Sequence, residues 1–220
     1  MRAQCQLKRN FCMQPSERSR PSQSRSQERV EKIIIATQKM LAQYGYEETT
    51  IKRIAQAAGI KQTSIYRYYP NKRAVCSLLA DIFIEEQNKA ITHCIEESLR
   101  GQPAEKIIHE FNTKLRLGMH QEQWISPVQL ALRSDPHLRD RHEEVLDHFA
   151  ERFSLMLSSF GVTETGESLM RISKSLVLIY DAYMMAIGRA PFETHPKVQE
   201  DFETVIHHYI TPFINGATKS

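Results

Sequence analysis

The spacing of apolar residues along this chain is helical over most of its length. From Val30 to Tyr44, apolar side chains recur every three or four residues, which places them on one face of an α-helix. Gly45 interrupts this pattern, and a shorter helical pattern follows Thr49 and Thr50, either of which can act as an N-cap. Gly59 then supplies the residue type that favours the left-handed conformation after a helix. The sequence therefore predicts two consecutive helices that end at these two glycines.

A third helix is predicted immediately after the second. It begins at Lys61 or Gln62, and two short helices joined by so tight a turn form a helix-turn-helix. We expect this third helix to extend to Tyr69, where Pro70 closes it. Asn71 is placed to cap a fourth helix.

The rest of the chain also has helical periodicity. Amphipathic stretches are expected at Asn71–Leu99, Pro103–Met119, Ser126–Arg133, Pro136–Leu157, Thr165–Gly188 and Pro196–Ile214. Glycine and proline residues separate them, and neither alternating β-branched runs nor an internal repeat compete with this pattern. The predicted fold class is all-α.

The N-terminal segment differs in composition from the rest of the chain. Residues 1–29 are rich in Ser, Gln, Arg and Pro and have almost no apolar periodicity, so they bury too little surface to offset the entropy of ordering. We therefore predict a disordered basic arm over residues 1–27, a three-helix helix-turn-helix domain over residues 28–74, and a larger helical domain over residues 75–220.

Charge divides the chain into a basic front and an acidic rear. Residues 1–80 carry 15 Lys and Arg against 5 Asp and Glu, whereas residues 81–220 carry 14 against 21. A basic segment of this kind suits a polyanionic partner, because neutralising phosphates with Lys and Arg releases condensed counterions. Charge alone leaves open a solvated basic tail with no partner.

The sequence also indicates the cellular compartment in which the protein functions. No apolar stretch reaches the roughly 18 residues that a membrane span needs, since the longest, Leu176–Ile187, contains Asp181. The basic N-terminus is not followed by the apolar region of a secretory signal. The four cysteines, Cys5, Cys12, Cys76 and Cys94, form no C-x-x-C pair and are expected to be free thiols. We expect a cytoplasmic protein without a membrane partner.

The segment Thr50–Lys72, TIKRIAQAAGIKQTSIYRYYPNK, resembles the DNA-binding domain of TetR-family repressors in residue type and spacing. The resemblance covers about residues 28–90. It implies that the third helix enters the major groove of DNA and that the fourth connects it to a C-terminal ligand-binding and dimerisation domain. It also implies a regulator that binds operator DNA as a homodimer and is released by a small molecule. An activator remains the alternative within the same family.

The outer face of the predicted second and third helices suits DNA. Gln62 and Arg67 can form hydrogen bonds with base edges, and Thr63 and Ser64 are short enough to let the helix approach closely. The resemblance places Tyr66, Lys72 and Thr50 at positions that meet backbone phosphates. The predicted DNA contacts are Thr50, Lys52, Lys61, Gln62, Thr63, Ser64, Tyr66, Arg67 and Lys72.

Two of these residues depart from the family's commonest pattern, and several have an alternative interpretation. Thr63 stands where Gly, Pro or Ala is frequent, and Lys61 where Ser is frequent, which leaves the operator sequence undetermined. Tyr66 can instead pack in the core of the small domain. Lys61, Arg67 and Lys72 can instead be solvated surface charges.

The C-terminal half is expected to hold the dimer interface and a ligand cavity. Two apolar stripes are candidates for the interface: Leu176, Leu178, Ile179, Tyr183, Met184 and Ile187 in one helix, and Phe202, Val205, Ile206, Tyr209, Ile210 and Phe213 in the last. Packing within one chain is the alternative for these stripes. The candidate cavity residues are Phe83, Phe111, Leu115, Met119, Trp124, Leu130, Phe153, Met156, Tyr180 and Met184, which predict an unidentified, partly apolar effector.

Other functional classes find less support in the sequence. His142 and His148 are six residues apart rather than four, and His207 and His208 lie on different faces of a helix, so no metal site is predicted. No nucleophile elbow, P-loop or dinucleotide-binding motif is present, so neither catalysis nor a cofactor is expected. A nonspecific nucleoid-binding protein is the main alternative, and a helical enzyme is the second.

Overall fold

The computed structural model describes residues 20–214, and every regular element in that range is a helix. The helices are α1 (Arg20–Glu48), α2 (Ile51–Ala58), α3 (Gln62–Tyr66), α4 (Lys72–Leu99), α5 (Ala104–Gln121), α6 (Ile125–Ser134), α7 (Arg139–Ser159), α8 (Gly166–Arg189) and α9 (His195–Ile210), with 3-10 turns η2 (Pro136–Leu138), η3 (Phe192–Thr194) and η4 (Thr211–Phe213). This confirms the all-α prediction. None of these helices is both long and apolar enough to cross a membrane.

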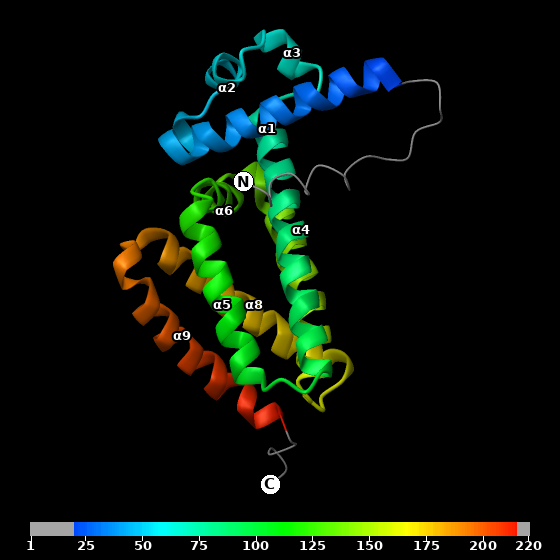
Figure 1. Cartoon of the computed structure of the whole chain (residues 1–220), viewed down its shortest axis with the longest axis vertical. Coiled ribbons are helices and arrows are strands. Elements are labelled where there is room, and N and C mark those ends of the chain that lie inside the picture. Colours follow the sequence, from blue (N-terminus) through cyan, green and yellow to red (C-terminus); the bar gives the residue numbers. More distant parts are fainter. Residues whose placement is uncertain (1–19, 215–220) are drawn as a thin grey trace.

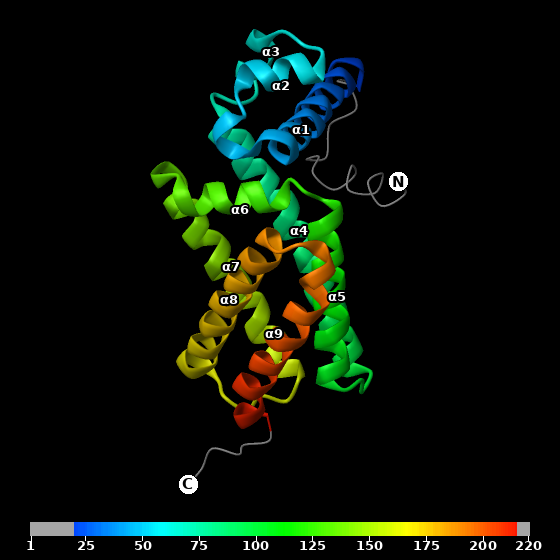
Figure 2. The ribbon, with the colours of Figure 1, turned by 90° about the vertical axis from the view of Figure 1, so that its left-hand side faces the viewer.

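The helices form two parts that α4 joins. Helices α1–α3 lie at one end of an elongated molecule, and α4 runs from them into a bundle with α5–α9 (Figures 1 and 2). Helix α6 lies across the top of that bundle, beneath α1, and the two helices are in contact. This arrangement places α4 and α6 between the two parts.

Helix α1 begins earlier than predicted. It starts at Arg20, so residues 20–27, which we assigned to a disordered arm, are helical. No glycine or proline lies between Pro21 and Gly45, so the polar residues continue the helix that the apolar pattern starts. The Ser26 Oγ also shares a hydrogen bond of 3.1 Å with the Tyr68 hydroxyl, which ties this extension to the region after α3. The rest of the predicted arm, residues 1–19, lies outside the described residues.

Local signals set the limits of α2. Thr50 is its N-cap, because the Thr50 side chain accepts a hydrogen bond from the Arg53 amide. Thr49 is buried instead, and its hydroxyl donates to the Gly45 carbonyl. Gly59 has a φ of 65° and ends the helix in the left-handed conformation, as predicted.

Helix α3 is shorter than predicted, while α4 begins where expected. The amides of Tyr68 and Tyr69 both bond to the Ile65 carbonyl in a turn that leaves the helix before Pro70. Asn71 then caps α4, because its Oδ1 accepts the Ala74 amide at 3.0 Å. The turn and the cap together fix the direction in which α4 leaves the helix-turn-helix.

Helices α4 and α7 run parallel and in register along a ladder of polar side chains. Three side-chain pairs join residues 60 positions apart, namely Asp81 with Arg141, Asn88 with His148, and Thr92 with Arg152. A fourth bond, from Ser98 to the carbonyl of Ser159, lies at the far end. Only parallel helices keep such a constant offset, so the ladder aligns α4 with α7 along most of their length.

Two apolar cores correspond to the two parts of the molecule. The small core holds Ile33, Ala36, Met40, Ile51, Ile54, Ala55, Ile65 and Val75. The large core fills the bundle of α4–α9 and reaches Leu41 and Tyr46 at the C-terminal end of α1. On α4, Val75 packs in the small core, and the next residue, Cys76, packs in the large core. The two cores therefore adjoin where α1 meets α4.

Candidate functional site

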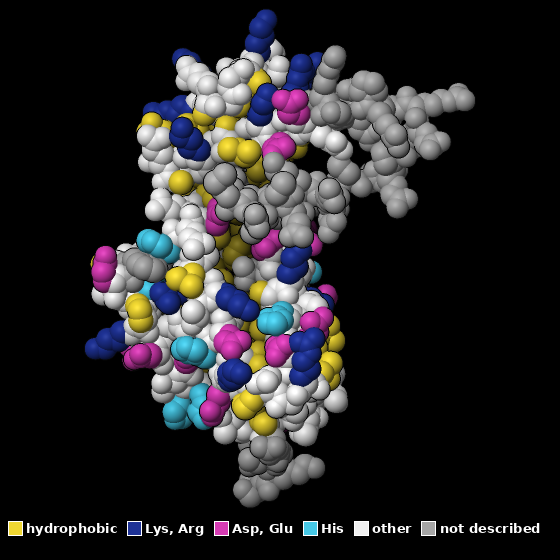
Figure 3. Space-filling model, viewed as in Figure 1, with side chains coloured by type: hydrophobic (Ala, Val, Ile, Leu, Met, Phe, Trp, Pro, Cys, Tyr) yellow, Lys and Arg dark blue, Asp and Glu magenta, His cyan; other side chains and the backbone are white. Residues whose placement is uncertain are grey.

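The structure gathers the predicted DNA contacts on one outer face of α2 and α3. Ile65 is fully buried in the small core, so the opposite side of α3 faces outward, and Tyr66 is 50% exposed there. Seven of the nine candidates are exposed: Thr50, Lys52, Lys61, Gln62, Thr63, Tyr66 and Arg67. Ser64 and Lys72 are half-buried. Lys and Arg side chains gather over this end of the molecule (Figure 3).

This face, which we call the reading face, offers groups suited to both bases and phosphates. The Gln62 Nε2 donates to the Tyr66 hydroxyl at 3.2 Å, so these two side chains are already oriented side by side on α3. The first amides of α2 have no carbonyl partner within the helix and point along its axis, an arrangement that binds phosphate oxygens. The face therefore combines side chains for the groove with a helix terminus for the backbone.

Lys72 is not a solvated surface charge, because backbone carbonyls and an aromatic ring hold its ammonium group. Its ammonium donates to the carbonyl oxygens of Tyr46 at 2.8 Å and Glu47 at 3.2 Å, and it lies 4.1 Å from the centre of the Tyr46 ring. These contacts satisfy the C-terminal carbonyls of α1 and add a cation–π interaction. Lys72 thus joins the start of α4 to the end of α1, and its phosphate contact stays a prediction.

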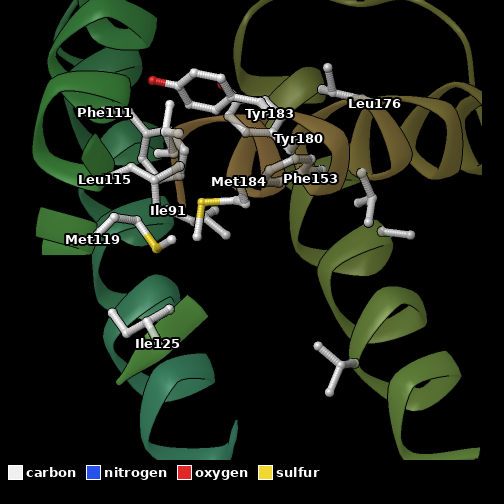
Figure 4. Packing of buried hydrophobic residues seen from close by; sticks show 14 of the residues in the cluster. Ile91, Phe111, Leu115, Met119, Ile125, Phe153, Leu176, Tyr180, Tyr183 and Met184 are labelled. Carbon is white, nitrogen blue, oxygen red and sulfur yellow. The ribbon is translucent and has the colours of Figure 1, made fainter. Parts of the chain in front are cut away.

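The bundle contains a cavity with an almost entirely apolar wall. Its volume is about 780 Å³, including the open mouth. Seven of the ten candidate cavity residues line it: Phe83, Phe111, Leu115, Trp124, Phe153, Tyr180 and Met184. In Figure 4, Phe111 and Leu115 from α5 point toward Phe153, Tyr180 and Met184 across the interior.

The other three candidate cavity residues do not line the cavity. Met119 and Met156 are buried in the large core instead. Leu130 is 45% exposed on α6 and faces away, which corrects the prediction for this residue. The reason is that Val128, Gln129 and Leu132 form the inner side of α6, leaving residue 130 on the outer side.

Polar groups are few in the cavity wall. The Gln129 Oε1 is buried and meets no hydrogen-bond donor among the described residues. His142 and Asp181 also line the cavity, and Asp181 forms an ion pair with Arg133. Burial, with the nearby Arg133 charge, lowers the pKa of His142, which favours a neutral imidazole. The wall thus suits an apolar ligand with a donor or polar group near α6.

A cluster around Asp135 fastens the bundle to the helix-turn-helix. The Asp135 Oδ2 accepts hydrogen bonds from the Tyr46 hydroxyl at 2.8 Å and the Arg73 Nε at 2.7 Å, and its Oδ1 accepts the His137 amide at 3.0 Å. Burial alone would raise the pKa of Asp135, but these hydrogen bonds lower it to about 2. The carboxylate is therefore ionised at neutral pH, and it joins α6 to both α1 and α4.

Sequence reasoning missed this cluster. Asp135 was assigned only to a break before Pro136, and Tyr46 and Arg73 carried no prediction. The one available signal was the Asp-Pro pair, which marks a turn but not the partners of the carboxylate.

The helix-turn-helix matches a known family. The model of the family described as "Bacterial regulatory proteins, tetR family" matches residues 33–77, from the buried side of α1 to the first turns of α4. Residues 33–77, the helix-turn-helix part of this chain, therefore belong to the TetR family of DNA-binding domains. The match covers the reading face and its supporting core, so the sequence resemblance is confirmed.

Proteins similar to this chain include a regulator of fatty acid metabolism and two solved FadR structures. The "Fatty acid metabolism regulator protein" of Bacillus subtilis (strain 168) is 26% identical over 118 residues, which are 52% of this chain and 58% of that relative's length. The structure of Thermus thermophilus FadR in complex with lauroyl-CoA is 21% identical, with a TM-score of 0.58, over 82% of this chain and 93% of that chain. B. subtilis FadR with stearoyl-CoA is 20% identical, with a TM-score of 0.57, over 84% and 98%. At these identities the two structures establish a shared fold.

The stripes that we predicted for dimerisation lie mostly inside the chain's own core. Seven of their twelve residues are buried in the chain's own core: Leu176, Tyr183, Met184, Ile187, Phe202, Ile206 and Ile210. Leu178 on α8 and Val205 on α9 are instead 58% and 52% exposed. Most of the predicted interface residues therefore pack within the chain. Fewer apolar residues than predicted remain on the outer surfaces of α8 and α9.

The remaining chemical predictions concern cysteines and metals. Cys76 and Cys94 are buried free thiols, as predicted, and burial raises their pKa to about 12 and about 11. Cys5 and Cys12 lie outside the described residues. Over residues 20–214, no three His, Cys, Asp or Glu side chains are arranged to hold a metal ion.

Proposed function

We propose that this TetR-family regulator is a repressor that binds a palindromic operator as a homodimer and leaves it when an acyl-CoA fills the cavity. The observation that carries the proposal is that one helix, α4, connects the reading face to the cavity. Helix α4 begins beside the reading face and contributes Ala80, Phe83 and Ile91 to the cavity wall. A ligand in the cavity therefore contacts the helix that positions α3.

The DNA half of the proposal rests on the reading face. Exposed Gln62 and Arg67 supply directional hydrogen bonds to base edges, and Lys52 and Lys61 supply charge near the backbone. A single short recognition helix reads few base pairs, so two copies on half-sites about one helical turn apart are needed for specificity. A protein that works on chromosomal operators in this way acts in the cytoplasm.

The ligand half rests on the cavity and on the relatives. An apolar wall of aromatic, leucine and methionine side chains suits an alkyl chain, and two relatives of the same fold have bound lauroyl-CoA and stearoyl-CoA. The buried Gln129 Oε1 supplies an acceptor for an N–H group on the ligand. Release then follows if the acyl-CoA binds the DNA-free conformation more tightly than the DNA-bound one.

A footprint on the DNA upstream of the protein's own gene tests the first half. We expect a protected palindrome. Diffuse protection that disappears at moderate salt would instead favour the nonspecific nucleoid-binding alternative. An increase in transcription of the adjacent genes when this gene is deleted identifies a repressor, and a decrease identifies an activator.

Titration of the protein–operator complex with lauroyl-CoA and stearoyl-CoA tests the second half. We expect both to release DNA, and coenzyme A without an acyl chain to have little effect, because the cavity wall binds the alkyl part. The acyl-CoA should also raise the melting temperature of the free protein, by mass action. Release by coenzyme A alone, or by neither acyl-CoA, would contradict the proposed ligand.

A further inference from the structure

Helix α6 is attached at both ends to parts of the molecule that have different functions. Its N-cap, Trp124, lies in the cavity wall, and its C-cap, Asp135, binds Tyr46 and Arg73. Between these caps are only ten residues, four of which line the cavity: Ile125, Val128, Gln129 and Leu132. A short helix moves largely as a rigid body, so a displacement at the cavity reaches Asp135.

Close packing against α8 limits how α6 can move. A Cβ at Gly188 would overlap the Ser126 Oγ, so the N-terminal turn of α6 lies directly against the backbone of α8. With this end held, a ligand that presses on Val128, Gln129 and Leu132 displaces mainly the other end of the helix. That end carries Asp135.

Tyr46 extends the connection to the reading face. Its hydroxyl donates to Asp135, while its ring and its carbonyl oxygen hold the Lys72 ammonium. Lys72 begins α4, six residues after the end of α3. The contacts from Asp135 to Tyr46 and from Tyr46 to Lys72 are continuous, and Arg73 gives Asp135 a second contact on α4.

We propose that Asp135 is the positioning residue through which the cavity sets the DNA affinity of the reading face. The proposal rests on the proposed function and names the contact by which it is regulated. The Asp135 side chain is 9% exposed and holds two partners from the helix-turn-helix with one oxygen, so a shift of α6 breaks or bends both bonds together. The two bonds are partly buried, and charge-assisted hydrogen bonds of this kind are strong enough to support the usual allosteric couplings of about 5- to 150-fold.

Trp124 provides a test that needs no ligand. It is the only tryptophan of the chain, and it lies at the opposite end of α6 from Asp135. Because coupling between two sites is reciprocal, DNA bound at the reading face must alter the surroundings of Trp124. The probe is a duplex that the wild-type protein selects from a random-sequence pool, and the readout is the change in Trp124 emission on saturation with this duplex.

Tyr46→Phe and Asp135→Asn are the test variants, and Asp147→Asn is the matched control. The control also loses a carboxylate that pairs with a cation, Lys174 at 2.8 Å, but this pair joins α7 to α8 and does not include α6. We expect the wild-type protein and Asp147→Asn to show the same emission change. Both test variants should lose at least about half of it while still binding the duplex, and lauroyl-CoA should weaken their DNA affinity by a smaller factor than in wild type.

The outcomes separate this proposal from the proposed function. An equal emission change in wild type and both test variants, or no change in wild-type protein that binds the duplex, overturns the role of Asp135. A wild-type protein that selects no duplex contradicts the proposed function, and this proposal with it. If one test variant fails to fold, the other and Arg73→Gln carry the same comparison, with folding checked by circular dichroism.

Discussion

The hydroxyl of Tyr180 donates a hydrogen bond of 2.9 Å to the Oδ1 of Asn112, whose side chain is fully buried beside the cavity. Tyr183 lies one turn later on α8 and stacks on Phe202 with ring centroids 4.0 Å apart, but its buried hydroxyl meets no acceptor among the described residues. The two tyrosines therefore have similar burial and opposite hydrogen-bonding states.

This difference predicts opposite effects of the same substitution. Tyr180→Phe leaves a buried amide oxygen of Asn112 unpaired and should destabilise the protein by about 1–3 kcal/mol. Tyr183→Phe removes a buried hydroxyl that has no partner and should be neutral or slightly stabilising. Urea unfolding of both variants measures the two midpoints against the wild type. A Tyr183→Phe variant that is destabilised as much as Tyr180→Phe would show that the Tyr183 hydroxyl has a partner after all.

The ion pair at Asp135 predicts a dependence of stability on pH. The folded protein holds the pKa of Asp135 at about 2, below its ordinary value, so the unfolded chain takes up this proton first as the pH falls. The carboxylate therefore contributes stability above about pH 4 and loses that contribution as the pH falls toward 2. The stability advantage of wild type over Asp135→Asn should be constant from pH 5 to 7 and shrink below about pH 4.

Thermal unfolding at a series of pH values measures this advantage. The control is Asp147→Asn, which removes an exposed ion pair with Lys174 and should change stability little at any pH. A difference between wild type and Asp135→Asn that stays constant down to pH 3 would contradict the predicted ionisation.

The two lysines next to α3 should respond differently to removal. Lys61 is exposed, so Lys61→Ala should weaken DNA binding and reduce the salt slope by about 0.9 for each phosphate that is no longer neutralised, while leaving the melting temperature unchanged. Lys72 holds two carbonyls at the end of α1, so Lys72→Ala should lower both DNA affinity and stability, the latter by about 1 kcal/mol. DNA titrations between low and moderate salt, paired with melting curves, make the comparison. Equal melting temperatures for the two variants would contradict the structural role of Lys72.

The exposed Leu178 predicts that the outer face of α8 forms part of a dimer interface. Leu178→Glu places a charge on the outer face of α8 and should shift the protein from dimer to monomer without unfolding it. Leu155→Glu is the control, since Leu155 is similarly exposed on α7. Sedimentation of both variants, with operator binding alongside, gives the result. Dimers of unchanged affinity in Leu178→Glu would place the interface elsewhere.

Local features of the sequence were enough to predict most of the helices and the side of α3 that is exposed. Asn71 caps α4 and Gly59 ends α2 because both residues act on the backbone within one turn, whatever the rest of the chain does. The outer side of α3 followed from the apolar pattern that buries Ile65. Where such a marker was missing, as at the polar start of α1 or after Tyr66, the predicted limits were several residues off.

Contacts between distant residues could not be predicted in this way. Asp135 lies 62 residues from Arg73 and 89 from Tyr46, and nothing near any of the three marks the others as partners. The stripes of α8 and α9 show a related limit. Periodicity identifies an apolar face but not whether the chain's own core or a second protomer covers it, and Tyr183 and Ile206 proved to be internal.

The constant offset of 60 residues between α4 and α7 also sets an order of events during synthesis. The small core is complete once Val75 has been made, whereas the far half of α4 has no α7 beside it until residues 139–159 have left the ribosome. Domains generally fold as units from the N-terminus during translation. The end of the molecule that carries the reading face can thus form on a nascent chain whose ligand cavity does not yet exist.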